Sequence, residues 1–260
     1  MSAAVILGSA FADGAHGLAL TPETVETPFG AWTLHRTPAG ALVSFRHGLP
    51  HRWLPHQIPY RAQAWALQAA GATHLLVTSS VGVLSREVPL FTPLVAADLL
   101  FPGNRLPDGS ACTMWPEPAA GHGHLLVRDG LFSTALSERL ARLAVRVTGA
   151  DPPRVVFAYA GGPRGKTPAE NRYWSALGAD VNAMTLAPEV VLANELEIPT
   201  AGLCVGHKYS VPGVAVPGDA GIAASLDASR EATAAVVAAW LADDAPVAFA
   251  NEIYRFDAGR

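Results

Sequence analysis

The chain has 260 residues, of which half are apolar and 15% are charged, and its formal net charge is −4. Such a composition buries a large core, and the negative balance argues against the broad basic field of nucleic-acid-binding proteins. No stretch reaches the ~18 consecutive apolar residues of a membrane helix. We therefore expect neither a nucleic acid nor a membrane as a partner.

The number of cysteines and the length of the chain further narrow the class of protein. Cys112 and Cys204 are the only cysteines, and no zinc-ligand spacing surrounds them. Two distant thiols indicate reduced, buried side chains. The N-terminal residues lack the basic start of a secretory signal. We expect a cytoplasmic protein without a metal site, and the length favours one domain over residues 1–260.

The N-terminal half begins with strand signals. Residues 3–9 form an apolar run that ends in Gly-Ser, which predicts a buried strand and a loop. Residues 31–36 and 41–46 alternate in polarity around a Thr-Pro-Ala-Gly turn, which predicts a hairpin. Residues 61–71 have apolar residues at helical spacing and end in glycine, which predicts a helix. Residues 74–82 predict an apolar strand that ends in small hydroxyl residues.

The C-terminal half alternates strands and helices. Residues 86–124 are rich in proline and glycine and predict one strand with long loops. The elements predicted after them are a helix over 132–149, a strand from 154, a helix over 167–179 capped by Thr167, a strand over 179–185, a helix over 187–198, a strand over 198–206 and a helix over 225–244. This order predicts an α/β fold with a central mixed, largely parallel twisted sheet that helices flank.

Cations and hydroxyls gather where the predicted strands end. The motifs are Gly8-Ser9, Arg46-His47, Ser79-Ser80, residues 162–166, Met184-Thr185 and residues 206–208. Ligands of α/β sheets lie beyond the carboxyl ends of the strands. The sequence therefore predicts one composite site that binds an anion.

At these motifs the chain resembles the trimeric purine nucleoside phosphorylases and methylthioadenosine phosphorylases. The resemblance rests on VILGS at 5–9, RHGLPHRWLPHQIPYRAQAWAL from residue 46, VTSSVGVL at 77–84, GPRGKTPAE at 162–170 and LGADVNAMTLAPEVVLANELEI at 177–198. It implies the nucleoside phosphorylase fold, a homotrimer, and phosphorolysis of a purine or purine-like nucleoside to the free base and ribose 1-phosphate. Inorganic phosphate is the implied co-substrate, with no other cofactor.

By position, the resemblance also implies roles for single residues. Those implied to bind phosphate are Ser9, Arg46, His47, Ser79 and Ser80, and those implied to bind ribose or base are Gly82, Gly165, Lys166, Met184 and Thr185. The chemistry agrees, because an arginine fork with hydroxyl and backbone donors suits a phosphate held next to an anomeric carbon.

The base-binding end departs from the family pattern. Gly165-Lys166 stands where relatives commonly carry an aromatic residue and an acid. His207, or Lys208 after a one-residue slip, stands where relatives carry an Asp or Asn that meets N7 of the purine. We expect His207 to act as a general acid near neutral pH, or Lys208 to stabilise an anionic leaving group. Together with Lys166 this favours a base more acidic than adenine.

Other functions stay open at this point. No counterpart of the family histidine at the ribose 5′-hydroxyl is evident, which favours a deoxy or substituted 5′-position. A nucleoside hydrolase would use water in place of phosphate, and a family member can be recruited to specialised biosynthesis or to non-catalytic nucleoside binding. A hydrolase has no need for the set formed by Ser9, Arg46, His47 and Ser79, so that set favours the phosphorylase.

Overall fold

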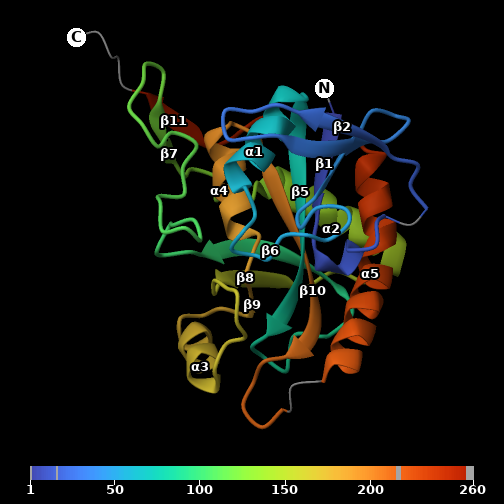
Figure 1. Ribbon diagram of the computed structural model, residues 1–260. Helices are drawn as coiled ribbons and strands as arrows, with labels where there is room; N and C mark the ends of the chain where they lie inside the picture. Colours follow the sequence, from blue (N-terminus) through green and yellow to red (C-terminus); the bar gives the residue numbers. More distant parts are fainter. Residues whose placement is uncertain (1, 16, 215–217, 256–260) are drawn as a thin grey trace.

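A computed structural model describes residues 2–15, 17–214 and 218–255 (Figure 1). Its main sheet contains β1 (Ser2–Leu7), β2 (Thr21–Val25), β3 (Trp32–Arg36), β4 (Leu42–Phe45), β5 (Ala72–Val83), β6 (Pro93–Leu100), β8 (Arg154–Tyr159), β9 (Val181–Ala183) and β10 (Thr200–Tyr209). These nine strands lie in the order β10-β6-β8-β9-β5-β1-β4-β3-β2. A separate two-stranded sheet pairs β7 (Gly123–Leu126) with β11 (Glu252–Arg255).

The main sheet is mixed, as the sequence predicts. Strand β1 pairs in parallel with β4 and with the central strand β5, and β5 also pairs in parallel with β10. Strand β8 is parallel to both β6 and β9. The antiparallel pairs are β2–β3, β3–β4, β5–β9 and β6–β10. The parallel strands thus bring several carboxyl ends to the same region of the sheet.

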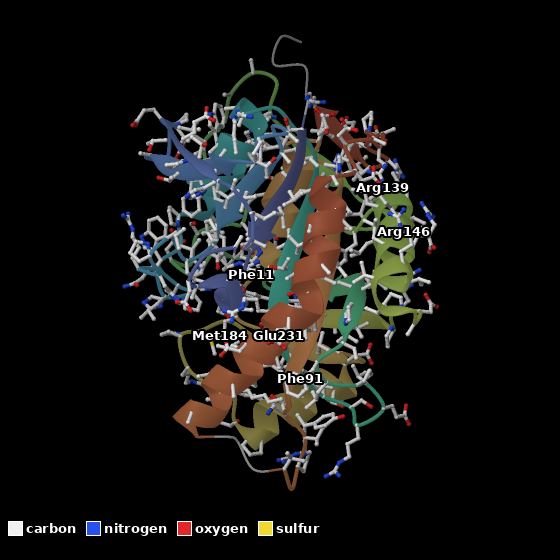
Figure 2. The ribbon with its side chains drawn as sticks, turned by 90° about the vertical axis from the view of Figure 1, so that its right-hand side faces the viewer. Phe11, Phe91, Arg139, Arg146, Met184 and Glu231 are labelled. Carbon is white, nitrogen blue, oxygen red and sulfur yellow. The ribbon has the colours of Figure 1, made fainter. Side chains whose placement is uncertain are left out.

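Helices cover both faces of this sheet. Helices α1 (Tyr60–Ala69) and α4 (Ala187–Glu195) contact each other on one face, and α2 (Thr134–Thr148) and α5 (Asp219–Leu241) contact each other on the opposite face. Figure 2 shows α5 lying lengthwise over the sheet, with Phe11 beside it. Each pair buries apolar side chains against the strands, for example Leu67 and Leu192 on one face and Leu140 and Trp240 on the other. This burial on both faces explains why the central strands are almost wholly apolar.

Local sequence signals explain where several helices begin. Helix α3 (Pro168–Ala176) starts with the predicted capping box: Thr167 Oγ1 accepts a hydrogen bond from Glu170 N, and the Glu170 carboxylate accepts one from Thr167 N at 2.8 Å. The Ser133 side chain caps α2, and Gly149 ends it in the left-handed conformation. The hairpin of β3 and β4 and helix α1 also form where they are predicted.

Three features differ from the sequence-based expectation. Strand β10 does not end at the predicted residue 206 but continues through His207-Lys208, because its pairing with β5 extends from Val205 opposite Ser80 to Tyr209 opposite Val83. Helix α5 begins at Asp219, before the predicted 225, because its first turns consist of small residues without a periodic pattern. Strands β2, β7 and β11 had no recognisable sequence signal, since each is short and largely exposed. No helix in the described part of the chain is long and apolar enough to cross a membrane.

Candidate active site

One pocket contains all of the site residues that the sequence predicts. It has a volume of about 550 Å³ and lies where β1, β4 and β8 end and beside the second halves of β5 and β10. Its lining includes Ser9, Arg46, His47, Ser79, Ser80, Gly82, Gly165, Lys166, Met184, Thr185, His207 and Lys208. The fold therefore gathers residues from six separate segments around one space. Their individual roles stay predictions.

Arg46 is fixed at one end of this pocket by a buried ion pair. Its side chain is 1% exposed, and its Nε donates to Oε1 of Glu189, which is equally buried. Glu189 lies in the first turn of α4, where the helix dipole favours a carboxylate. Among the described residues, Nη2 of Arg46 has no hydrogen-bond partner. The guanidinium is thus oriented by one edge and keeps a buried donor for a further acceptor.

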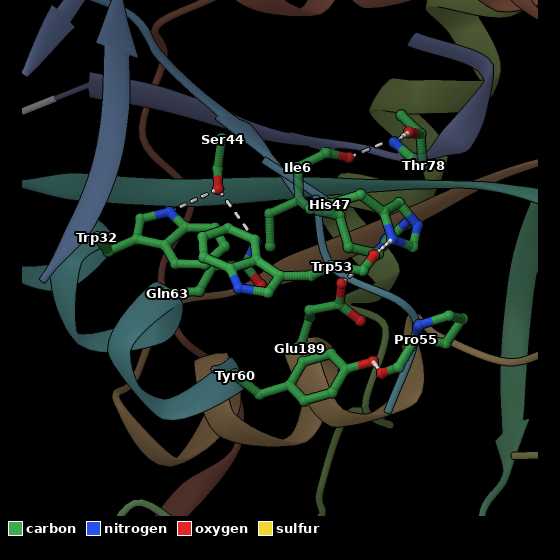
Figure 3. A network of polar contacts seen from close by, with 12 residues as sticks. Ile6, Trp32, Ser44, His47, Trp53, Pro55, Tyr60, Gln63, Thr78 and Glu189 are labelled. Carbon is green, nitrogen blue, oxygen red and sulfur yellow. Dashed lines mark hydrogen bonds and ion pairs between the residues drawn. The ribbon is translucent and has the colours of Figure 1, made fainter. Parts of the chain in front are cut away.

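The loop after β1 is shaped around this guanidinium. Gly8 N donates to Thr78 Oγ1 at 3.0 Å, and Thr78 Oγ1 donates to the carbonyl of Ile6 at 3.0 Å (Figure 3). A Cβ on Gly8 would lie 2.6 Å from Nη1 of Arg46, closer than any real contact. Only glycine therefore fits between the guanidinium and β5, and Ser9 follows it directly into the pocket lining.

His47 is held in one tautomer beside Arg46. Its Nδ1 lies 2.8 Å from the carbonyl oxygen of Trp53, which accepts only, so Nδ1 carries the proton (Figure 3). Burial, the charge of Arg46 and, more weakly, His51 lower the pKa of His47 to about 4. His47 is therefore neutral at pH 7, with a lone pair on Nε2. A bound dianion would favour the imidazolium and raise this pKa.

The middle of the pocket is closely packed around glycines. A Cβ on Gly162 would lie 3.0 Å from Sδ of Met184, so the methionine side chain rests against this backbone. A Cβ on Gly82 would lie 2.5 Å from Oγ of Ser210. Asn182 is buried and donates from Nδ2 to Asn171 at 3.2 Å, while its Oδ1 has no partner within the described residues. This region therefore offers a flat apolar surface next to a free amide oxygen.

A bulge in β10 places two neighbouring side chains in the same pocket. Gly206 lies opposite Val81, but Lys208 lies opposite Gly82, so the register shifts at His207. Successive side chains of a regular strand point to opposite faces, and a bulge changes where one of them points. Both His207 and Lys208 accordingly line the pocket. The sequence left open which of the two stands in the base-binding position, and in the structure both lie in the pocket lining.

The surroundings of His207 do not favour the general-acid role that the sequence suggested for it. Burial and the charges of Lys208 and Lys166 lower the pKa of His207 to about 4. Ser225 Oγ donates to the carbonyl of Ile222 at 2.7 Å, so it accepts from Nδ1 of His207 at 3.2 Å. The imidazole is then neutral at pH 7, with its proton on Nδ1 and a lone pair on Nε2. This argues against proton donation by His207 to a leaving base.

Several pocket residues were missed by sequence reasoning. They are Asn171, Asn182 and the segment 209–214, and Glu189, which binds Arg46 behind the pocket, was missed as well. An acid four residues after the Met-Thr pair, in a largely apolar helix, was a usable signal, because an unpaired carboxylate is rarely buried. Asn171 and Asn182 had no comparable signal, since only the packing of α3 on β9 brings them together. No group of three or more metal-ligating side chains occurs in the described part of the chain.

Comparison with known proteins agrees with this geometry. Residues 3–242 match the model of the phosphorylase superfamily. The chain belongs to this superfamily. A probable S-methyl-5′-thioinosine phosphorylase of Methanopyrus kandleri is 36% identical over 75% of this chain and 74% of its own length. A probable 6-oxopurine nucleoside phosphorylase of Moorella thermoacetica is 33% identical over 79% of this chain and 76% of its own.

Solved structures show the same fold for this phosphorylase. The methylthioadenosine phosphorylase of Schistosoma mansoni, in complex with adenine, superimposes with a TM-score of 0.78 at 24% identity. The match covers 94% of this chain and 93% of that one. Family membership and the activities of the relatives make the chain an enzyme, a pentosyltransferase of the nucleoside phosphorylase type that uses phosphate as co-substrate.

Proposed function

We propose that this enzyme cleaves the N-glycosidic bond of a purine or purine-like nucleoside with inorganic phosphate and releases the free base and ribose 1-phosphate. The observation that supports this most directly is the single pocket that joins a fixed guanidinium, a row of hydroxyls and a base-binding end. Its volume of about 550 Å³ suits a nucleoside together with a phosphate.

Phosphate is assigned to the end of the pocket near Arg46. The guanidinium offers its free Nη2, and Ser9, Ser79 and the backbone at Ser80 offer further donors around the same space. Charge-assisted hydrogen bonds of this kind are about twice as strong as neutral ones. His47 contributes either an acceptor for the phosphate hydroxyl or, once protonated, a donor. Glu189 acts as a positioning residue, since it touches Arg46 and not the pocket.

The sugar is assigned to the middle of the pocket. Met184 supplies an apolar surface under the ribose, and Thr185 lies next to it in the lining. The reaction passes through an oxocarbenium-like state, so a phosphate held directly below the anomeric carbon both attacks and stabilises the positive charge. Holding the two reactants in this arrangement removes about 7–11 kcal/mol of the barrier.

The pocket lining restricts the base and the 5′-group of the nucleoside less than it restricts the phosphate and the ribose. The relatives named above act on 5′-methylthio nucleosides or on 6-oxopurine nucleosides. An apolar hollow of about 420 Å³ adjoins the pocket through His207–Tyr209 and includes Phe91 and Ala224. The small residues at the start of α5 leave room for a substituent, so we propose a deoxy or substituted 5′-position.

Three further properties belong to this proposal. We propose a homotrimer, by resemblance to the family, and a cytoplasmic location, which suits the two buried free thiols Cys112 and Cys204. We also treat residues 1–260 as one domain, because the nine-stranded sheet includes both β1 and β10. Light scattering of the purified protein tests the trimer: a mass three times that of one chain is expected, and a monomer would contradict it.

Incubation of a panel of nucleosides with and without phosphate tests the reaction. The panel varies the base among adenine, hypoxanthine and xanthine, and the 5′-group between hydroxyl and methylthio. We expect free base and ribose 1-phosphate (or its 5′-substituted form) only when phosphate is present. Equal release of base in phosphate-free buffer would replace the phosphorylase with a hydrolase.

A further inference from the structure

The two lysines of this chain line the same pocket. Lys166 and Lys208 are the only lysines among 260 residues, since every other cationic side chain except histidine is an arginine. Lys166 follows Gly165 in the loop after β8, and Lys208 lies in the bulged end of β10. Both are partly buried and line the base-binding end. An ammonium is a compact charge that loses its proton far more readily than a guanidinium, so the two cations are not interchangeable.

Among the described residues that line the pocket, no acidic side chain neutralises these two ammonium groups. The described lining contains no Asp or Glu. Glu170, on α3, is the acid that acts on Lys166, but it already binds Arg164 through two contacts of 2.7 and 2.8 Å and also accepts from Thr167 N. Arg164 and Lys166 thus share one carboxylate, and with Lys208 in the same lining a local excess of positive charge remains.

The remaining groups in this region do not reduce that excess. Burial and the neighbouring Lys208 lower the pKa of Lys166 to about 8, although Glu170 opposes the shift. The two ammonium groups thus repel each other. His207 is neutral and presents a lone pair on Nε2, as derived above. An anion between the two lysines would relieve this repulsion, whereas a neutral base would leave it in place.

We propose that the end of the pocket formed by Lys166 and Lys208 binds a nucleobase that carries a negative charge as the free base, through an acidic ring N–H or a carboxylate substituent, and not a neutral 6-aminopurine. This inference rests on the proposed phosphorolysis, because it concerns the leaving group of that reaction. It names the class of base that the comparisons with relatives leave undefined.

For a base with an acidic ring N–H, the reaction then needs no acid to protonate the leaving nitrogen. The C1′–N bond breaks and its electron pair passes to the ring nitrogen, while a phosphate oxygen forms the new bond to C1′. The phosphate proton stays on the sugar phosphate and passes to water after release. The base departs as an anion between the ammonium groups of Lys166 and Lys208, which stabilise the charge as it develops.

Direct observation of the lysines tests this proposal without relying on turnover. Protein grown with lysine labelled with ¹³C at Cε gives two signals, which Lys166→Arg and Lys208→Arg assign. We expect xanthine, an acidic oxopurine, to shift both signals in the presence of phosphate and to raise the pKa of Lys166 above about 8. 5-Aminoimidazole-4-carboxylate tests the carboxylate in the same way. Adenine is expected to shift neither pKa.

Affinity measurements on variants provide the second readout. We expect Lys166→Met and Lys208→Met each to weaken binding of the anionic base about ten- to a hundredfold, as for a lost charge-assisted contact, and to leave adenine binding unchanged or tighter. Arg172→Met is the matched control, because Arg172 is an exposed cation on the adjoining helix α3 outside the pocket lining. Which probe binds, xanthine or the carboxylate, identifies the source of the negative charge.

The outcomes separate this inference from the proposed function. Phosphorolysis of adenosine or 5′-methylthioadenosine by the wild type that is as fast as phosphorolysis of a nucleoside with an acidic base would overturn the inference and leave the phosphorylase intact. Unchanged lysine signals with both anionic probes would also overturn it. Binding of an anionic base with both lysine shifts, but without phosphate-dependent cleavage of any nucleoside, would support the inference and contradict the proposed function.

Discussion

The pair formed by Arg46 and Glu189 shows how one buried residue controls another. A guanidinium that is 1% exposed requires a counter-charge, and Glu189 supplies it through one edge only. The opposite edge keeps Nη2 free in the described structure. The same pair therefore stabilises the fold and prepares the proposed phosphate site.

Replacement of Glu189 by glutamine is expected to destabilise the protein by about 3 kcal/mol at pH 7, because it leaves the buried charge of Arg46 without a counter-ion. Phosphate should restore part of the loss, since a bound anion supplies the missing charge. Urea denaturation with and without phosphate measures both effects. Glu23→Gln is the control, because the Arg36–Glu23 pair is 35% and 43% exposed and should lose less than about 1 kcal/mol. Equal losses in the two variants would contradict the prediction.

Gly8→Ala tests the contact between the loop after β1 and Arg46. The new Cβ would lie 2.6 Å from Nη1 and 3.2 Å from the carbonyl oxygen of Thr78, so the guanidinium must move. Because a displacement of about 1 Å can cost about a hundredfold in rate, we expect kcat/KM for phosphate to fall at least tenfold. Steady-state kinetics measures it. Gly103→Ala has nothing within 4 Å and should change neither kinetics nor stability; a similar fall there would refute the assignment.

At the scale of elements, helix α3 depends on its cap more than any other helix of the described structure. It buries no residue, and it follows directly after the loop that carries Lys166. Its capping box and the Arg164–Glu170 pair therefore hold both the helix and the loop in place. Helix α2, in contrast, buries a full apolar face.

Thr167→Ala is expected to open α3 locally, since loss of a cap costs about 1 kcal/mol. Amide hydrogen exchange in residues 168–176 should become about five- to tenfold faster while the global free energy of unfolding stays almost constant. Ser133→Ala removes the cap of α2 and should instead lower global stability by about 1 kcal/mol, because the packed helix cannot open alone. Identical exchange behaviour in the two helices would contradict this distinction.

At the scale of the whole molecule, buried histidines link stability to pH. The native pKa of His47 is about 4, against 6.5 for an unperturbed histidine. Between these values the unfolded chain binds more protons than the native one, so stability is complete above pH 6.5 and decreases as the pH falls towards 4. His47 alone contributes about 1.4 kcal/mol per pH unit within this window.

Chemical denaturation between pH 7 and 4 measures this dependence. His47→Gln, which keeps an amide donor for the Trp53 carbonyl, should flatten the curve by that amount. The exposed His56→Gln should leave the slope unchanged. Phosphate should make the decline smaller, because a bound anion raises the native pKa of His47 towards its unfolded value. A slope that His47→Gln does not alter would show that His47 is not neutral in the native protein.

The sequence by itself determined most of the fold and the inventory of the site. The alternation of apolar strands with capped helices predicted the mixed sheet, because burial on both faces and helix ends leave local signals. The motifs at Ser9, Arg46, Ser79 and Met184 pointed to one composite site, since strand ends of an α/β sheet converge. The resemblance named the family that the comparisons then showed.

Tertiary structure alone decided what the site residues do to each other. The pairing of Arg46 with Glu189 joins positions 143 residues apart, and no local pattern encodes it. The bulge at His207 depends on how β10 pairs with β5. It brings Lys208 to the pocket that Lys166 lines from the loop after β8. The protonation states of the site residues depend on their burial and on their distances to other charged groups, which only the folded structure sets. For this reason the sequence could name His207 and Lys208, but only the packing lowers the pKa of His207 and sets Lys208 beside Lys166.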